Sequence, residues 1–220
     1  WHLCFTRLPC YGRRVRRNGV IRINLIKIDW SFILEIFELK YGWSKKYIWF
    51  GVVQNVYEGM DFNEHIKNKT ISFNIDTGTL EADCLGSGTG HSFYSEAVIN
   101  AMRENGNCLF SDYQIITSPT FTSKYFLVEI KSVIPRIKCS DTFSEPDIDK
   151  YCLDNGVTRN MILKLGNNIN PLYADMNKWD GSELFTLENS YLHLITRKLK
   201  EHLERNSFIN LIFEKIEFVK

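Results

Sequence analysis

Residues 74–79, NIDTGT, include the Asp76-Thr77-Gly78 string that aspartic proteases use. In those enzymes two aspartates share a proton and one of them activates a water molecule. This chain has one such string, so catalysis would require a homodimer that brings two copies of Asp76 together. The residues from Ile71 to Ile75 alternate apolar and polar, as a strand with one wet face does, and Asp-Thr-Gly is also common in turns. We favour the turn and keep the protease as an alternative.

A glycine-rich stretch, LGSGTGHSFYSEAVINAMRENG (residues 85–106), raises the question of a phosphate-binding loop. A Walker loop needs G-x-x-x-x-G-K-[ST], because backbone N–H groups wrap the phosphates and the lysine reaches the outer ones. On that pattern Leu85 stands at the first glycine and His91 at the lysine. We therefore predict that Gly86, Gly88 and Gly90 form a flexible approach to a structural helix.

The histidines and cysteines lack the spacing of metal ligands. The five histidines form no H-x-x-x-H pair, and the six cysteines form no C-x-x-C pair. Cys84 lies shortly before His91, but nothing around it indicates an activated thiolate, so we predict a buried thiol. His193 lies in an alternating strand, where we expect it to pack or to hydrogen-bond. We therefore predict no catalytic residue, no metal site and no cofactor, and a protein that is not an enzyme.

Trp179 is the best candidate for a side chain that contacts a partner. It lies in DMNKWDGSE (residues 175–183), where polar and turn residues surround it. Tryptophan is enriched among the residues that dominate binding at protein interfaces. Such a loop presents the indole ring to a partner or tucks it under the sheet. We assign Trp179 to partner binding and assign no other contact residue.

The surrounding pattern predicts an α+β fold with a mostly antiparallel sheet. Residues 29–42 suit a short helix, and strands are predicted in 47–53 and 70–76, the latter answered by 79–83 across a Thr77-Gly78 hairpin turn. Further strands are predicted in FLVEI, MILKL, LFTL, YLHLI and INLIFEKIEF. Two helices, SEAVINAMREN and TRKLKEHLERN, stand among these strands.

These two helices repeat one unit at an offset of 101 residues, over 95–115 and 196–218. Ser95 aligns with Thr196, and Met102 aligns with Leu203. In each copy a hydroxyl residue is placed to cap the first turn, a contribution of about 1 kcal/mol. Each helix then ends at an asparagine and leads into an apolar strand. The sequence therefore predicts two similar capped helices, each followed by a strand.

Charge divides the chain into two parts. The first thirty residues hold seven bases and one acid; subtracting them from the totals of 27 and 26 leaves 20 bases against 25 acids, a net charge of −5 for residues 31–220. We divide the chain into a basic extension, 1–42, for which an origin outside the native protein stays open, and a domain, 43–220. A basic arm suggests nucleic-acid binding as a second alternative, although a solvated tail is the favoured interpretation.

The chain has no apolar run long enough to span a bilayer. It also lacks the order of charged, apolar and small residues that a signal peptide shows. We expect a soluble, cytoplasmic protein.

Four segments resemble the immunity proteins of bacterial polymorphic toxin systems, in particular immunity-protein family 43 and the related family 11. They are SEAVINAMRENG, KYFLVEIKSVI, IKCSDTFSE and LFTLENSYLHLITRKLKEHLERNSFINLIFEKI, within residues 70–218. The resemblance implies a non-catalytic inhibitor that binds and silences a toxin of its own bacterium. A stable interface of this kind buries on the order of 1,600 Å². The acidic domain would suit a basic toxin.

Overall fold

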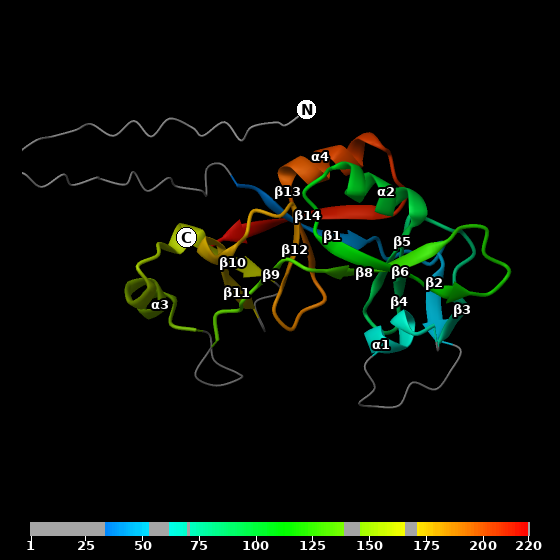
Figure 1. Cartoon of the computed structure of the whole chain (residues 1–220), viewed down its shortest axis with the longest axis horizontal. Coiled ribbons are helices and arrows are strands. Elements are labelled where there is room, and N and C mark those ends of the chain that lie inside the picture. The colour runs from blue at the N-terminus through cyan, green and yellow to red at the C-terminus, as the bar shows by residue number, and fades with distance from the viewer. Residues whose placement is uncertain (1–33, 53–61, 70, 139–145, 166–170, 220) are drawn as a thin grey trace, which may run out of the picture.

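The computed structural model describes residues 34–52, 62–69, 71–138, 146–165 and 171–219, and shows a mixed fold in which strands predominate (Figure 1). The strands form two curled, nearly closed sheets of seven strands each. The first sheet runs in the order β11 (Leu172–Asp175), β10 (Ile162–Leu165), β14 (Leu211–Phe218), β1 (Ile36–Tyr41), β13 (His193–Thr196), β12 (Leu184–Leu187) and β9 (Val133–Ile134). The second runs in the order β6 (Phe110–Gln114), β8 (Tyr125–Ile130), β5 (Ser92–Ser95), β4 (Cys84–Ser87), β2 (Trp49–Val52), β3 (Ser72–Thr77) and β7 (Ile116–Thr117).

Four α-helices occur in the described part of the chain: α1 (Phe62–Lys67), α2 (Glu96–Glu104), α3 (Ile148–Asn155) and α4 (Arg197–Arg205). Short 3₁₀ turns cover Arg159–Met161 and Met176–Lys178. None of these helices has the length and apolar content needed to cross a membrane. The prediction of a mixed fold with a mostly antiparallel sheet is confirmed, since most of the strand pairs are antiparallel.

The two predicted capped helices are confirmed as α2 and α4. The hydroxyl of Ser95 accepts the N–H of Val98, and that of Thr196 accepts the N–H of Leu199, both at 3.4 Å. Each helix leads into a strand, β6 and β14 respectively. The helices lie side by side (Figure 1), and their apolar faces share one buried cluster with residues of β1, β8 and β13. The repeat recognised in the sequence therefore builds the centre of the molecule.

The repeat extends well beyond the helices. The hairpin β4–β5, helix α2 and strand β6 correspond to the hairpin β12–β13, helix α4 and strand β14. Strand β2 pairs parallel to β4, as β9 pairs parallel to β12. Strand β8 lies between β5 and β6, as β1 lies between β13 and β14. The chain is thus two copies of one unit, beginning at β1 and at β8.

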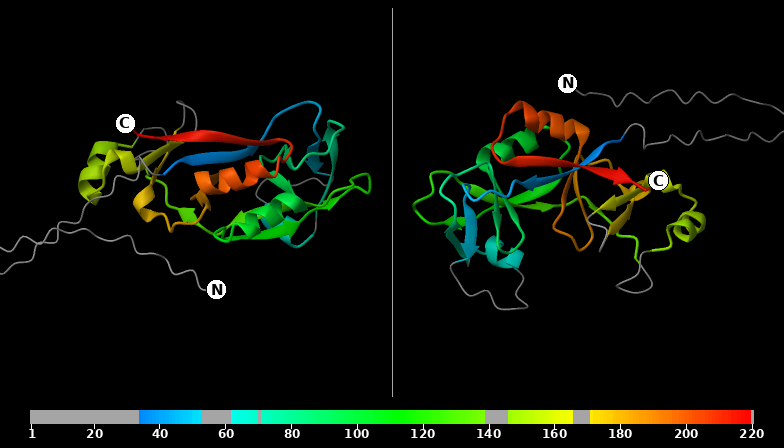
Figure 2. Two further views of the ribbon diagram at one scale, coloured as in Figure 1. Left: turned by 90° about the horizontal axis from the view of Figure 1, so that it is seen from above. Right: turned by 180° about the vertical axis from the view of Figure 1, so that it is seen from behind.

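The two copies exchange their first strands. Strand β1 belongs to the first copy, yet it pairs with β13 and β14 of the second copy. Strand β8 of the second copy pairs with β5 and β6 of the first. The register is the same on both sides, since Tyr41 opposite Leu211 repeats as Ile130 opposite Phe110. Figure 2 shows the blue β1 beside the red β14, far away in sequence. Each copy therefore completes the sheet of the other.

The predicted helix over residues 29–42 is wrong for its described part, because residues 36–41 form β1. Ile36 and Leu39 are buried in β1, which is hydrogen-bonded on both edges. A pairing supplied by residues more than 150 positions away overrides the local helical pattern. Residues 36–41 of the predicted extension are thus part of a sheet, while residues 1–33 lie outside the described part.

Two predictions about turns are also wrong. Residues 79–83 do not answer β3 in a hairpin: the N–H groups of Thr79 and Leu80 bond the carbonyl of Lys46, and β4 pairs with β2 and β5. The glycine-rich stretch is not a flexible approach to α2. Gly86 lies within β4, and the Gly90 N–H donates to the Ser87 carbonyl in the tight turn of the β4–β5 hairpin.

Candidate functional site

A pocket of about 160 Å³ lies where the two corresponding hairpins meet. His91 and Ser92 come from the β4–β5 hairpin, and Tyr191 and His193 come from the β12–β13 hairpin. Strand β8 closes one side with residues 127–130. The pocket brings hydroxyl, phenol and imidazole groups of both copies together around one hollow.

A difference between the two copies opens this pocket. In the first copy the ring of Tyr41 packs edge-on against Trp49, with 5.2 Å between ring centroids, and both rings press on Gly86. A Cβ atom at Gly86 would lie 2.5 Å from the Tyr41 ring and 2.7 Å from the Trp49 ring. At the corresponding positions the second copy has Ile130 and Val133, which are smaller than the two aromatic rings, and Thr186 in place of the glycine; Ile130 and Thr186 line the pocket.

Tyr94 and His193 form the polar centre of the contact between the two hairpins, which we call the seam. The Tyr94 hydroxyl lies 2.6 Å from His193 Nδ1, and the rings stack with 5.6 Å between centroids. Burial, together with the neighbouring His91, lowers the pKa of His193 to about 4, while burial raises the pKa of Tyr94 well above its usual value. At neutral pH the proton therefore stays on the tyrosine and the imidazole is uncharged.

His91 lies beside this pair and contacts the other hairpin. Its ring packs against Tyr191 with 4.9 Å between centroids, and its Nδ1 lies 3.2 Å from the Thr89 carbonyl. A carbonyl only accepts hydrogen bonds, so in this contact Nδ1 carries the hydrogen and donates. Burial lowers the pKa of His91 as well. The pocket therefore holds neutral imidazoles at physiological pH.

The hydroxyl groups of the pocket are engaged with the backbone and with one another. Ser190 donates to the Leu187 carbonyl at 3.0 Å, and its Oγ lies 3.3 Å from the Thr186 hydroxyl. A nucleophilic serine needs a base within hydrogen-bond reach to take its proton. The contacts of Ser190 instead fix the tip of the β12–β13 hairpin. This arrangement suits a structural seam, or a recess for a neutral group, better than acid–base chemistry.

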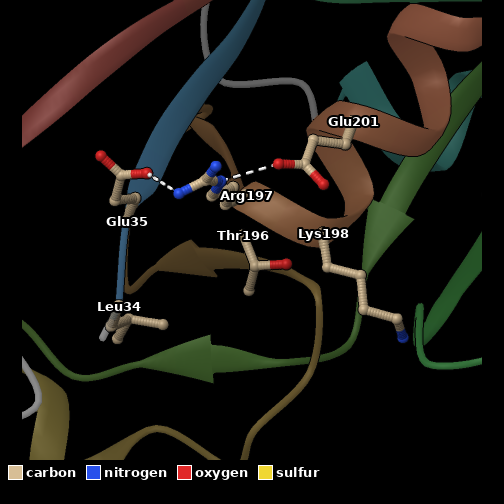
Figure 3. Close-up of a pocket in the computed structure, with 6 residues that line it drawn as sticks. All are labelled: Leu34, Glu35, Thr196, Arg197, Lys198 and Glu201. Atoms are coloured by element: carbon tan, nitrogen blue, oxygen red, sulfur yellow. Dashed lines mark hydrogen bonds and ion pairs between the residues drawn. The ribbon is translucent and has the colours of Figure 1, made fainter.

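A second hollow, of about 300 Å³, lies beside the start of α4. Its charged groups are paired: the Arg197 guanidinium donates to Glu201 at 2.7 Å and to Glu35 at 3.1 Å, as Figure 3 shows. Lys215 also donates to Glu35, and this hydrogen bond is the main cause that lowers the pKa of Glu35. Lys198 points away from Arg197 and pairs with Glu183. The hollow is thus a surface lined by ion pairs.

The residues predicted from motifs are not brought together. Asp76 is exposed on β3 and flanks Gly51 of β2, so the protease alternative would depend on a second chain at this edge. Cys84 is fully buried, which confirms the predicted buried thiol, and burial raises the pKa of this thiol well above the usual value. His193 hydrogen-bonds as predicted. Residues 1–30, on which the nucleic-acid alternative depends, lie outside the described part.

Trp179 is partly buried beside β12. Its indole N–H donates to the Ser182 carbonyl at 2.9 Å, and its ring packs against Phe185 with 5.6 Å between centroids. Part of the ring therefore contributes to the core of the second copy. Its assignment to partner binding stays a prediction. Within the described ranges, no group of three or more His, Cys, Asp or Glu side chains is placed to hold a metal ion.

Sequence reasoning did not identify Tyr94 and Tyr191 as members of this site. The alignment of the two copies does not single them out, because at the offset of 101 residues Tyr94 falls on Ile195 and Tyr191 falls on Gly90. Comparison with known proteins adds no assignment. No protein-family model matches the chain. No curated protein matches it with significance.

Proposed function

We propose that this protein is a non-catalytic immunity protein that acts in the bacterial cytoplasm and neutralises a cognate toxin by binding it. The proposal starts from the four segments that resemble such proteins. In the structure, three of them supply α2, β8 and the run from β12 to β14. These are the elements through which the two copies interlock. A binder needs such a preorganised framework, because ordering flexible groups on association costs affinity.

The observation that carries the non-catalytic part of the proposal is the state of the pocket between the hairpins. Tyr94 is paired with a neutral His193, and Ser190 donates to a backbone carbonyl. General bases work best with a pKa near the operating pH, and a histidine with a pKa of about 4 lies well below it. The reactive side chains of the site thus stabilise the seam between the two copies.

Co-expression tests the proposal. Immunity genes lie directly downstream of their toxin genes, so the candidate toxin is the C-terminal domain of the protein encoded immediately upstream. We expect expression of that domain alone to arrest growth and co-expression with this chain to restore it. The variant His193→Asn should also restore growth, because no catalytic step depends on the imidazole. Growth arrest that persists with the wild-type chain would contradict the proposal.

A further inference from the structure

We propose that the partner-binding surface lies where the turn before β14 contacts the first copy. We propose further that this surface binds an acidic segment of the partner protein. This inference rests on the proposed toxin-binding function and adds the place and the chemistry of contact. We name this surface the Trp43 surface. It consists of the loop after β1, the loop before β4, the turn after α4 and the start of β14. Its exposed side chains are Trp43, Lys45, Lys46, Leu80, Ile209 and Ile212.

Backbone contacts hold these three segments together. The Gly42 N–H donates to the Asn210 carbonyl at 3.3 Å, and the Asp83 N–H donates to the Ile209 carbonyl at 3.1 Å. The Leu80 N–H donates to the Lys46 carbonyl at 2.9 Å. A Cβ atom at Gly42 would lie 2.8 Å from the Ile212 side chain, so Ile212 abuts the base of the Trp43 loop. The exposed side chains therefore arise from one continuous patch of backbone.

Four of the ten large apolar side chains that are exposed among the described residues lie on this surface. Trp43 is 72% exposed, Leu80 is 52% exposed and Ile209 is 51% exposed. Single exposed apolar residues are normal on a protein surface, but several on neighbouring segments mark an interaction site. Tryptophan is the residue type most enriched among those that dominate binding energy. Trp43 is far more exposed than the partly buried Trp179 and makes a better anchor.

The second copy provides an internal comparison. Counting along β1 and β8 places Trp43 at Ser132, and counting back from β4 and β12 places Leu80 at Asp180. There the Ser132 hydroxyl is buried and donates to the Asp180 carboxylate at 2.7 Å. The same framework therefore closes this position with a polar pair in one copy and leaves an indole and a leucine in water in the other. The fold does not require the exposed pair.

The charges of the Trp43 surface indicate an acidic partner. Lys45 and Lys46 are exposed and form no ion pair within the described residues. The carboxylates of the junction are already engaged: Glu81 accepts the N–H groups of Thr122 and Ser123, and Asp83 accepts the Ser95 hydroxyl and the Ile209 N–H. Glu81 and Asp83 keep their negative charges but are only partly exposed, so the exposed charges of the Trp43 surface are those of the two lysines, opposite in sign to the −5 net charge of residues 31–220.

Affinity measurements with purified proteins test this surface, using the toxin domain encoded upstream as the probe. We expect Trp43→Ala to weaken binding about 30-fold, the effect of losing one dominant anchor. We expect Lys45→Glu with Lys46→Glu to weaken it about tenfold, because like charges then face each other. Leu109→Ala is the matched control, since Leu109 is 53% exposed at the corresponding junction of the second copy. It should bind as the wild type does, and all variants should keep the wild-type melting temperature.

The other outcomes separate the claims. Wild-type affinity in the Trp43 and lysine variants would overturn the Trp43 surface while toxin binding stands. Tighter binding by the double glutamate variant would overturn the acidic chemistry. A wild-type chain that does not bind the domain would overturn the proposed function together with this inference. A concentration-dependent dimer that Trp43→Ala abolishes would assign the surface to a second copy and so overturn it as a toxin contact.

Discussion

At the scale of single residues, the two helix caps predicted from the sequence are confirmed. Ser95 and Thr196 cap their helices because each needs only the first turn that follows it. The chain leaves each helix in the left-handed region, at Gly106 with φ 79° and at Ser207 with φ 53°. Glycine adopts this region freely, whereas serine does so at a cost. Serine in place of glycine thus raises the conformational free energy at this position, while the chain leaves both helices in the same conformation.

The Tyr94–His193 pair could not be predicted, because its two residues are joined only by the contact between hairpins. That contact has a measurable consequence. The folded pKa of His193, about 4, lies below the unfolded value near 6.5. Between these values the unfolded chain binds a proton that the folded chain does not, so stability falls as pH drops from 6.5 to 4. The lowered pKa corresponds to about 3 kcal/mol.

His193→Asn tests this dependence by chemical denaturation at a series of pH values. Asparagine retains an acceptor for the Tyr94 hydroxyl and has no proton to gain. We expect its unfolding free energy to fall less steeply than that of the wild type between pH 6.5 and 4. His91, whose pKa is also lowered, accounts for part of the pH dependence of stability that remains in the variant. Parallel curves for the two proteins would show that His193 is not buried as described.

At the scale of elements, the sequence predicted most strands and the two central helices but misassigned segments whose partners are distant. Strand β8 is predicted because its own pattern is apolar and β-branched or aromatic, whereas the residues of β1 read as a helix. The two strands pair in the same register, but each pairs with the other copy, so no local pattern indicates their equivalence. The glycine-rich stretch is predicted wrongly for a related reason, since Gly86 packs closely against rings that are distant in sequence and Gly90 adopts the positive φ of the hairpin turn.

Gly86→Ala tests that packing. The added methyl group would lie within 3 Å of the rings of Tyr41 and Trp49, which pack against each other, so both rings would have to shift. Overpacking of this kind costs about 1–3 kcal/mol of unfolding free energy. Gly88→Ala is the matched control in the same hairpin, because the nearest atom to its Cβ would be 3.9 Å away. Thermal denaturation should show a clear loss for Gly86→Ala alone, and equal melting temperatures would contradict the packing.

At the scale of the whole molecule, the duplication predicts that the domain unfolds cooperatively. Neither copy holds a complete sheet by itself, since β1 and β8 are each contributed to the other copy. The connection between the copies, residues 118–124, is exposed at Pro119 and Thr120. A cut there removes no strand pairing. The exchanged strands, rather than the covalent link, are expected to hold the two copies together.

A protease site inserted after Thr120 tests this expectation. We expect the cleaved chain to elute as one species in native size-exclusion chromatography and to separate only in denaturant. Each fragment refolded alone should lack a cooperative unfolding transition, and the two refolded together should regain it. Fragments that separate under native conditions, or one that unfolds cooperatively alone, would contradict the exchanged arrangement.

The central claim, that this chain acts by binding and not by catalysis, is tested most directly by titrating it against a fixed amount of active toxin domain. The account predicts that toxin activity falls linearly and reaches zero at one molecule of this chain per molecule of toxin. Denaturing separation of the mixture should then return unmodified toxin. Activity that disappears with time at a small fraction of that ratio would mean turnover and would contradict the account, as would full toxin activity at a large excess.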